Sequence, residues 1–138
     1  MILLDTNVLS ELMRAKPDPA VVAWIDAQPG QDLLISSITV AEILYGIARM
    51  PKGKRRQALH DLAIAMFEED FAGRILPFDA DAAVHYAELA AESEAKGKIA
   101  DMAGQIAAIA KLHGVPVATR NVRHFESFGV ALINPWNG

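Results

Sequence analysis

The sequence predicts an α/β fold in which helices cover both faces of a central parallel sheet. Short apolar segments alternate with longer amphipathic ones, which is typical of parallel strands joined by helical crossovers. The short segments are apolar at successive positions, as expected for strands buried on both faces. The length of 138 residues, 52% of them hydrophobic, fits a single domain spanning residues 1–138 with a well-filled core.

Five segments are expected to form the strands, because each is short, apolar and bounded by residues that favour turns or helix starts. The first of them leads directly into Asp5 and then into a helix. Pro116 is tolerated in the fourth because it stands near the beginning of that strand. The expected strands are residues 2–4, 33–35, 74–78, 115–119 and 130–133.

Helices are expected between these strands, and several carry start and stop signals. Asp18 caps a helix with Pro19 at its first position, Asp79 caps another that runs to about Lys96, and Gly114 ends the last long one. Helical spacing assigns these side chains to buried faces: Val40, Ile43, Leu44 and Ile47; Leu59, Leu62, Ala63, Met66, Phe67 and Phe71; Ala83, Tyr86, Ala87 and Ala90; Met102, Ile106, Ile109 and Ala110.

The composition excludes several classes of protein. The chain has no cysteine, which excludes disulfides and thiolate metal sites, and no apolar run approaches the ~20 residues that span a bilayer. The N-terminus has no signal-peptide pattern, so a cytoplasmic location away from membranes is expected. A net charge of −4 argues against a globally basic nucleic-acid binder. A nuclease stays possible, because a cation held by carboxylates inverts the local potential.

Polar residues follow several of the expected strands at comparable positions. Asp5 follows the first strand, Glu42 is expected in the first turn of the helix after the second, and Asn121 follows the fourth. All three should reach the carboxyl edge of the sheet, where open α/β folds bind ligands. Asp101, at the start of the helix before the fourth strand, could approach them. Carboxylates without cysteine or paired histidines suit Mg²⁺ or Mn²⁺, ions that activate water and stabilise phosphoryl transition states.

Each of these residues also has a purely structural interpretation. Asp5, Asp79 and Asp101 could act as helix N-caps, and Thr39 with Glu42 has the spacing of a capping box. The basic residues 52–56 could form a solvated face, although cations in the first turn of a helix oppose its dipole. Glycine-rich phosphate loops and a Gly-x-Ser-x-Gly elbow are absent from the sequence, which disfavours a nucleotide-binding or acyl-hydrolase domain.

Six motifs occur in a fixed order along nearly the whole chain. They are residues 1–10 (MILLDTNVLS), 36–46 (SSITVAEILYG), 76–79 (LPFD), 105–110 (QIAAIA), 118–122 (ATRNV) and 133–136 (INPW). With these motifs in this order, the chain resembles a PIN-domain toxin of the VapC family, closest to its FitB-like branch.

The resemblance implies a PIN-like three-layer α/β/α sandwich with a central parallel sheet of about five strands. It also implies a Mg²⁺- or Mn²⁺-dependent endoribonuclease that serves as the toxin of a type II toxin–antitoxin pair. Its partners would be an RNA substrate and a VapB-like antitoxin that holds it inactive, within a homodimer and a toxin–antitoxin hetero-oligomer. DNA would be bound only indirectly, through the antitoxin.

Carried over by position, the family's first two metal-binding acids fall on Asp5 and Glu42. The third usually stands three residues before the Ile of the Ile-Ala-Ala run, which places it at Ala103. Asp101 is the nearest acid. It cannot replace a residue at 103 if both lie in one regular helix, because side chains two helical positions apart point about 200° apart, but it could if the helix begins later and residues 100–103 form a loop. The fourth, more variable position falls on Asn121. The expected catalytic residues are therefore Asp5, Glu42, Asp101 and Asn121, with the first three as metal ligands.

The alanine at position 103 leaves an alternative function open. The chain could be a catalytically impaired PIN-domain protein that still pairs with an antitoxin. In the active form, Thr6 and Asn121 would orient the site. Arg120, Arg123 or the basic residues 52–56 would contact the RNA backbone.

Overall fold

The central sheet has five strands, and every strand pairs parallel to its neighbours in the order β3-β2-β1-β4-β5. The structure is a computed structural model and describes residues 1–137. Strands β3, β4 and β5 have only two residues each and are shorter than the sequence predicted. The expected five-stranded parallel sheet is confirmed, with strands β1 (Ile2–Leu4), β2 (Leu33–Ser36), β3 (Ile75–Leu76), β4 (Val117–Ala118) and β5 (Leu132–Ile133).

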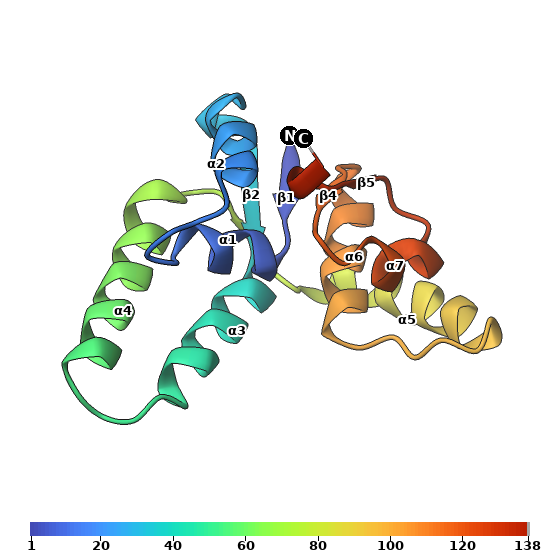
Figure 1. The fold of residues 1–138 in the computed structure, drawn as a ribbon. Coiled ribbons are helices and arrows are strands. Elements are labelled where there is room, and N and C mark those ends of the chain that lie inside the picture. Colours follow the sequence, from blue (N-terminus) through green and yellow to red (C-terminus); the bar gives the residue numbers. More distant parts are fainter. Residues whose placement is uncertain (138) are drawn as a thin grey trace.

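Helices cover both faces of this sheet, which gives the three-layer α/β/α arrangement. In Figure 1, α1 to α4 lie on one side of the strands and α5 to α7 on the other. Within residues 1–137, no helix is long and apolar enough to cross a bilayer. The helices are α1 (Thr6–Leu12), α2 (Pro19–Asp26), α3 (Ser37–Ala48), α4 (Lys54–Ala65), α5 (Ala80–Ala95), α6 (Met102–His113) and α7 (Val122–Phe125), with a π turn at Met66–Asp70 and short 3-10 turns at Gly30–Asp32, Glu126–Phe128 and Pro135–Asn137.

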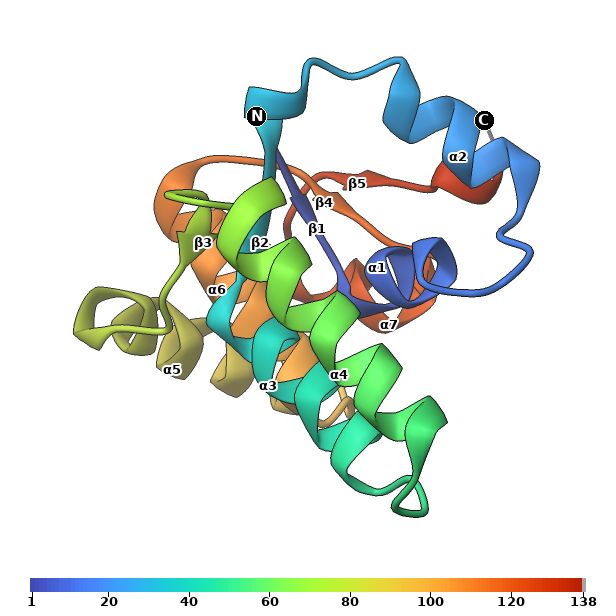
Figure 2. The ribbon, with the colours of Figure 1, turned by 90° about the vertical axis from the view of Figure 1, so that its left-hand side faces the viewer.

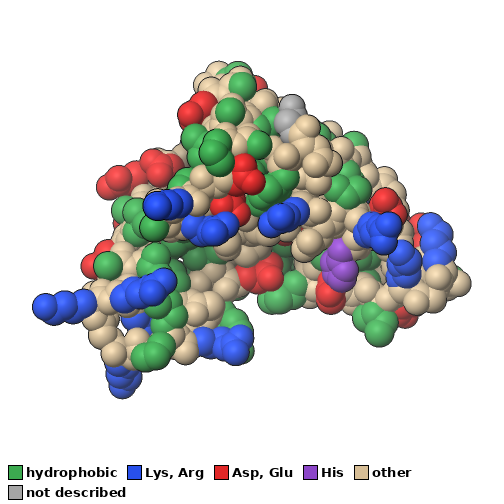
Figure 3. All heavy atoms as spheres, in the orientation of Figure 1, with side chains coloured by type: hydrophobic (Ala, Val, Ile, Leu, Met, Phe, Trp, Pro, Cys, Tyr) green, Lys and Arg blue, Asp and Glu red, His purple; other side chains and the backbone are tan. Residues whose placement is uncertain are grey.

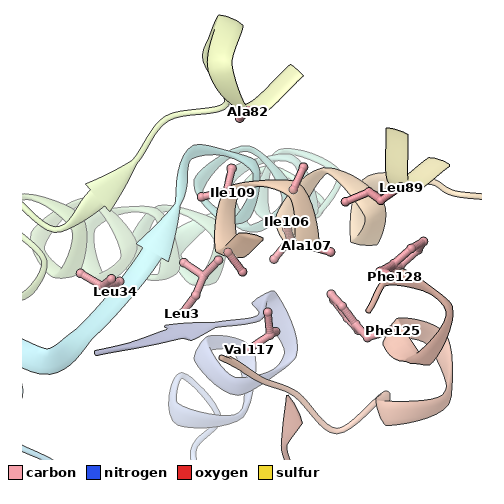
Figure 4. Close-up of a cluster of buried hydrophobic side chains, with 12 residues drawn as sticks. Leu3, Leu34, Ala82, Leu89, Ile106, Ala107, Ile109, Val117, Phe125 and Phe128 are labelled. Atoms are coloured by element: carbon pink, nitrogen blue, oxygen red, sulfur yellow. The ribbon is translucent and has the colours of Figure 1, made fainter. Parts of the chain in front are cut away.

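The strands contribute side chains to a hydrophobic cluster on each face. Successive strand residues point to opposite faces, so Leu3 joins the cluster under α5 and α6, whereas Leu4 joins the cluster under α1, α3 and α4. Figure 4 shows the first cluster, in which Ile106 and Ile109 of α6 pack toward Leu3. Both faces of the sheet are therefore covered, as the continuous apolar strands predicted.

The buried helix faces agree only in part with those expected from periodicity. Leu62 and Met102 are 51% and 45% exposed, although both were expected to point inward. In α5, Ala83 and Ala87 are exposed. Periodicity gives the angular spacing of apolar side chains, but the packing of neighbouring elements decides which arc meets the core. The side chains that α5 buries are Ala82, Leu89 and Ser93.

The pair α3 and α4 extends beyond the sheet as a helical hairpin. Figure 2 shows the two helices side by side and running in opposite directions. Residues 49–53 connect them, and α4 begins at Lys54 without a side-chain cap. The first residues of α3 lie at the carboxyl edge of the sheet, because α3 follows β2 directly.

Candidate active-site cavity and metal centre

A cavity opens at the carboxyl ends of the central strands. Because β1 lies between β2 and β4, this edge is the topological switch point of the sheet, where open α/β folds bind ligands. The cavity has a volume of about 730 Å³. All four expected site residues line it: Asp5, Glu42, Asp101 and Asn121.

Asp5 lies at the floor of the cavity, directly after β1, and is 7% exposed. Its Oδ1 accepts a hydrogen bond from the Thr6 backbone N–H at 2.8 Å, and its Oδ2 accepts one from the Thr119 hydroxyl at 2.8 Å. Asp5 is thus the N-cap of α1 and also lines the cavity, so its two interpretations are compatible. Burial raises the pKa of the Asp5 carboxyl above its ordinary value, against the opposing effect of these hydrogen bonds.

Glu42 approaches Asp5 from α3 and is held by a chain of hydroxyl groups. The Thr6 hydroxyl donates to Glu42 Oε1 at 2.8 Å and lies 3.0 Å from the Thr39 hydroxyl oxygen. Since each hydroxyl has one proton, Thr39 donates to Thr6, and Ser36 donates in turn to Thr39 at 3.4 Å. This arrangement directs hydroxyl protons toward the carboxylate and fixes its orientation. We call Asp5, Thr6, Thr39 and Glu42 the inner wall of the cavity.

The capping-box interpretation of Thr39 and Glu42 is wrong. The cap of α3 is Ser36, whose hydroxyl accepts from the Thr39 backbone N–H at 3.1 Å. Glu42 is therefore the sixth residue of the helix, in its second turn and not its first. Burial raises the pKa of the Glu42 carboxyl, and the neighbouring charges of Asp5 and Asp101 raise it further.

Asp101 lies on the opposite side of the cavity, at the start of α6. It is the N-cap of that helix, accepting from the Ala103 backbone N–H at 2.9 Å, so it lies outside the regular helix. The loop over residues 100–103 that would let Asp101 take the place of an acid at 103 does not form, because α6 already begins at Met102. Asp101 and Ala103 nevertheless both line the cavity. His124 Nε2 lies 3.0 and 3.1 Å from the two Asp101 carboxylate oxygens. We call Asp101, Asn121 and His124 the outer wall.

The turn after β4 connects the two walls through Thr119, which is fully buried. Its hydroxyl oxygen accepts from the Asn121 backbone N–H at 3.0 Å and from Asn7 Nδ2 at 3.3 Å, while its proton goes to Asp5. Arg120 donates its backbone N–H to Asn7 Oδ1 at 3.4 Å. Sequence reasoning missed Thr119, although it follows β4 just as Asp5 follows β1. It also missed His124, whose partner stands 23 positions away in the sequence.

The other proposed RNA contacts lie outside the cavity, apart from Arg120, which lines it. Arg123 lines a neighbouring depression beside α7, and Arg55 lines a groove between α1, α3 and α4. Lys52 and Arg56 border a separate hollow at the tip of the hairpin. The structure therefore brings together the acidic residues but spreads the cations around them.

The inner wall provides oxygen ligands of the kind that bind Mg²⁺ or Mn²⁺. In the described part of the chain, neither Asp5 nor Glu42 forms an ion pair with a lysine or arginine. Burial raises the pKa of both carboxyls, and a bound cation would favour their charged forms. Among the described residues, no three Asp, Glu or His side chains converge closely enough to hold an ion by themselves. Mg²⁺ commonly binds to one or two carboxylates and completes its shell with water and phosphate, so Asp5 and Glu42 fit this ion.

Comparison with known proteins gives consistent matches over almost the whole length. A family model described as PIN domain matches residues 2–130. The chain is 51% identical over 137 residues to VapC ribonuclease Y4jK of Sinorhizobium fredii, covering 99% of this chain and 98% of that protein. It is 46% identical over 138 residues to Toxin FitB of Neisseria gonorrhoeae, covering 99% of each. The structure of FitAB bound to an IR36 DNA fragment superposes with a TM-score of 0.92 at 44% identity, covering 99% of this chain and 96% of that one.

Proposed function

This chain belongs to the PIN-domain family, and on that premise we propose that it is a metal-dependent endoribonuclease and the toxin of a type II toxin–antitoxin pair. The observation that carries the proposal is the convergence of Asp5, Glu42, Asp101 and Asn121 on one cavity at the switch point of the sheet. The names of the similar proteins, a VapC ribonuclease and a toxin, agree with it.

Asp5 and Glu42 would hold Mg²⁺ or Mn²⁺, and Asp101, on the opposite side of the cavity, would act as the third carboxylate through water. When bound, such an ion supplies an activated water for attack on a phosphodiester and offsets the charge of the transition state. The residues of this chain fix the ligands: Thr119 orients Asp5, and Thr6 orients Glu42. Hydrogen-bonded partners of this kind keep metal ligands in place and contribute to metal affinity.

The catalytically impaired alternative depends on Ala103. It loses support because Asp101 lies on the same cavity, outside the regular helix, and therefore supplies a third carboxylate there. RNA cleavage by the wild type and by the Ala103→Asp variant distinguishes the two functions. An impaired protein would cleave RNA only after this substitution, whereas the proposed enzyme cleaves RNA with alanine at this position.

The direct test is RNA cleavage by the wild type with Mg²⁺ or Mn²⁺, with and without EDTA, beside two variants. Asp5→Ala should abolish cleavage, as should EDTA. Asp79→Ala is a matched control, because Asp79 is also an N-cap carboxylate, accepting from Ala82 N–H at 2.9 Å, but it does not line the cavity. Equal cleavage in all samples would exclude a metal-dependent nuclease, and equal loss in both variants would indicate an effect of helix capping.

An antitoxin of the VapB type is the proposed protein partner. The groove between α1, α3 and α4 has apolar walls that include Met50, Leu59 and Leu62, and Leu62 is 51% exposed. An amphipathic helix docks into such a groove through its apolar face. Trp24 of α2 packs against the core and is less available for such a contact.

The proposed assembly is a homodimer bound to antitoxin, acting in the cytoplasm. DNA contacts are assigned to the antitoxin, because this chain is acidic overall with a net charge of −4. Size-exclusion chromatography with light scattering, on the chain alone and with its antitoxin, measures both steps of assembly. A chain that stays monomeric at all concentrations would contradict the homodimer.

A further inference from the structure

The catalytic cavity is the middle part of a longer trough. At one end it shares the lining residues Ser10, Arg14 and Glu42 with the groove between α1, α3 and α4. At the other end it shares Arg120 and Asn121, together with Asp101 and His124, with the depression beside α7. We call the whole depression the trough; its acidic part lies in the centre, and an arginine marks each of the two junctions.

Arg14 is held at its junction by a buried acid. Its Nη1 lies 3.1 and 3.0 Å from the two carboxylate oxygens of Glu11, which is only 6% exposed and also accepts from the Asp18 backbone N–H at 2.9 Å. The Arg14 side chain itself is 64% exposed. The contact therefore leaves most of the guanidinium open to a ligand while restricting its position, which reduces the entropy lost on binding.

Arg120 is held at the other junction by an aromatic ring. Its guanidinium carbon lies 5.2 Å from the centroid of the Trp136 ring, a cation–π geometry. Neither arginine forms an ion pair with Asp5 or Glu42 in the described part of the chain, so neither compensates the acidic centre. Each is instead placed to contact an anion that enters the trough.

The charges along the trough have a pattern that the net charge of −4 conceals. On the side of the α3–α4 hairpin the lining cations are Arg14, Lys16 and Arg55, and beside α7 they are Lys98, Arg120 and Arg123. Figure 3 shows Lys and Arg side chains around a central acidic group on one face of the molecule. An acidic centre between two cationic arms suits a polyanion whose middle part meets a bound cation.

We propose that the trough binds one single strand of RNA, with Arg14 and Arg120 contacting backbone phosphates on either side of the cleaved bond. This inference rests on the proposed function. A single strand is favoured because Asp5 lies at the floor with only 7% exposure, and a flexible backbone can bend into a trough that a rigid duplex bridges. The guanidinium of Arg120, stacked on Trp136, also offers its outer face to a nucleobase.

The test measures RNA binding apart from cleavage. In an Asp5→Asn background, a short fluorescein-labelled single-stranded RNA and its duplex with the complementary strand are titrated by fluorescence anisotropy over a range of salt. The single strand should bind more tightly than the duplex. Arg14→Ala and Arg120→Ala should each weaken binding several-fold and reduce the slope of log K against log salt by about 0.7, the value for one lost phosphate contact on a single strand.

Lys111→Ala is the matched control, because it also removes one exposed cation but lies in the last turn of α6, outside the trough. The RNA affinity of this variant, and its slope of log K against log salt, should equal those of the Asp5→Asn parent. Because Arg14→Ala leaves the buried Glu11 without its partner, Arg14→Lys is measured beside it. This variant keeps a cation next to Glu11 and should recover part of the affinity for single-stranded RNA. Arg120 has no buried partner of this kind, so its variant tests the proposal independently.

Three results would overturn the proposal: equal or tighter binding of the duplex, unchanged salt slopes in both arginine variants, or an effect of these variants on antitoxin binding alone. If the wild type cleaves RNA but both arginine variants bind RNA as the parent does, the trough is not the RNA-binding surface, and the proposed nuclease activity still holds. Tight single-strand binding through both arginines, in a wild type that cleaves no RNA, would reject the nuclease and leave the trough standing.

Discussion

The inner and outer walls of the cavity differ in how firmly they hold their carboxylates. On the inner wall, Asp5 is almost fully buried and both of its oxygens accept hydrogen bonds, while Glu42 ends a chain of hydroxyl groups that begins inside the protein. On the outer wall, Asp101 and His124 are each about half exposed and depend on one another and on a helix cap. The inner wall is fixed by the core, whereas the outer wall is open to solvent and can adjust.

We infer from this difference that the two walls have different roles in binding the metal. Carboxylates that are partly or fully buried are costly to keep charged without a cation, and burial raises the pKa of both Asp5 and Glu42 above the ordinary value. An exposed carboxylate such as Asp101 costs little and contributes less, because water screens it. We therefore expect the inner wall to determine whether the metal binds and the outer wall to modulate how well.

Removing a carboxylate from each wall should give the largest contrast. Glu42→Gln should lower RNA cleavage roughly 10³-fold, since a group acting on the charged transition state is lost. Asp101→Asn should lower it about tenfold. Single-turnover cleavage rates at saturating Mn²⁺ measure both, and a greater loss in Asp101→Asn than in Glu42→Gln would reverse the assignment of the walls.

The hydroxyl chain of the inner wall should be nearly as important as its carboxylates. Thr6→Val keeps the shape of the side chain but removes the donor to Glu42, so metal affinity should fall roughly 10- to 100-fold, as expected for a hydrogen bond that orients a ligand. Thr6→Ser keeps the hydroxyl and should stay near wild type. Isothermal titration with Mn²⁺ compares the two, and equal affinities would show that the hydroxyl has no such role.

The sequence predicted the inner wall better than the outer wall for a physical reason. Alternating strands and helices place Asp5, directly after β1, and the N-terminal half of α3, which follows β2, at the same edge of the sheet, so the fold class predicts that Asp5 and Glu42 line the same site. Their hydrogen bonds do not follow from it, because Thr6 and Thr39 are 33 positions apart and meet only after β1 pairs with β2. Local pattern also allowed a capping box between Thr39 and Glu42, which does not form because Ser36 caps α3.

The geometry of the outer wall could not be predicted from the periodicity of the sequence. Whether Asp101 reaches the cavity depends on where α6 begins, and a shift of one residue would turn its side chain away. The contact with His124 joins the start of α6 to α7, and the sequence does not predict how these two elements are placed relative to one another. The same limit applied to Leu62, which periodicity placed in the core and the structure exposes along the groove beside α3.

Restoring an acid at position 103 should strengthen the outer wall. Ala103→Asp places a carboxylate on the cavity, which should raise Mn²⁺ affinity roughly tenfold, equivalent to about 1.4 kcal/mol. It should also lower the melting temperature of the metal-free chain, because another negative charge joins Asp5 and Glu42. His124→Ala removes the side chain that contacts both carboxylate oxygens of Asp101, and it should lower the Mn²⁺ affinity less than tenfold. A gain of cleavage from zero in Ala103→Asp would support the impaired alternative instead.

The smallest expected effect is a dependence of stability on pH. Burial raises the pKa of Asp5 above its ordinary 3.8, so the folded metal-free chain holds more protons than the unfolded chain as pH rises past that value. The free energy of unfolding therefore decreases with pH through this interval. Asp5→Asn lacks this loss, so its melting temperature relative to wild type should increase with pH. Scanning calorimetry in EDTA measures the difference, and added Mn²⁺ should stabilise only the wild type, mostly at neutral pH.

The central claim, that the inner wall binds the metal and the outer wall modulates it, is tested most directly by Mn²⁺ binding measured by electron paramagnetic resonance. Wild type, Asp5→Asn and Asp101→Asn would be titrated at the same pH and ionic strength. We predict that Asp5→Asn leaves no specific binding, whereas Asp101→Asn retains it with an affinity within about tenfold of wild type. Specific binding that survives in Asp5→Asn and disappears in Asp101→Asn would contradict this account.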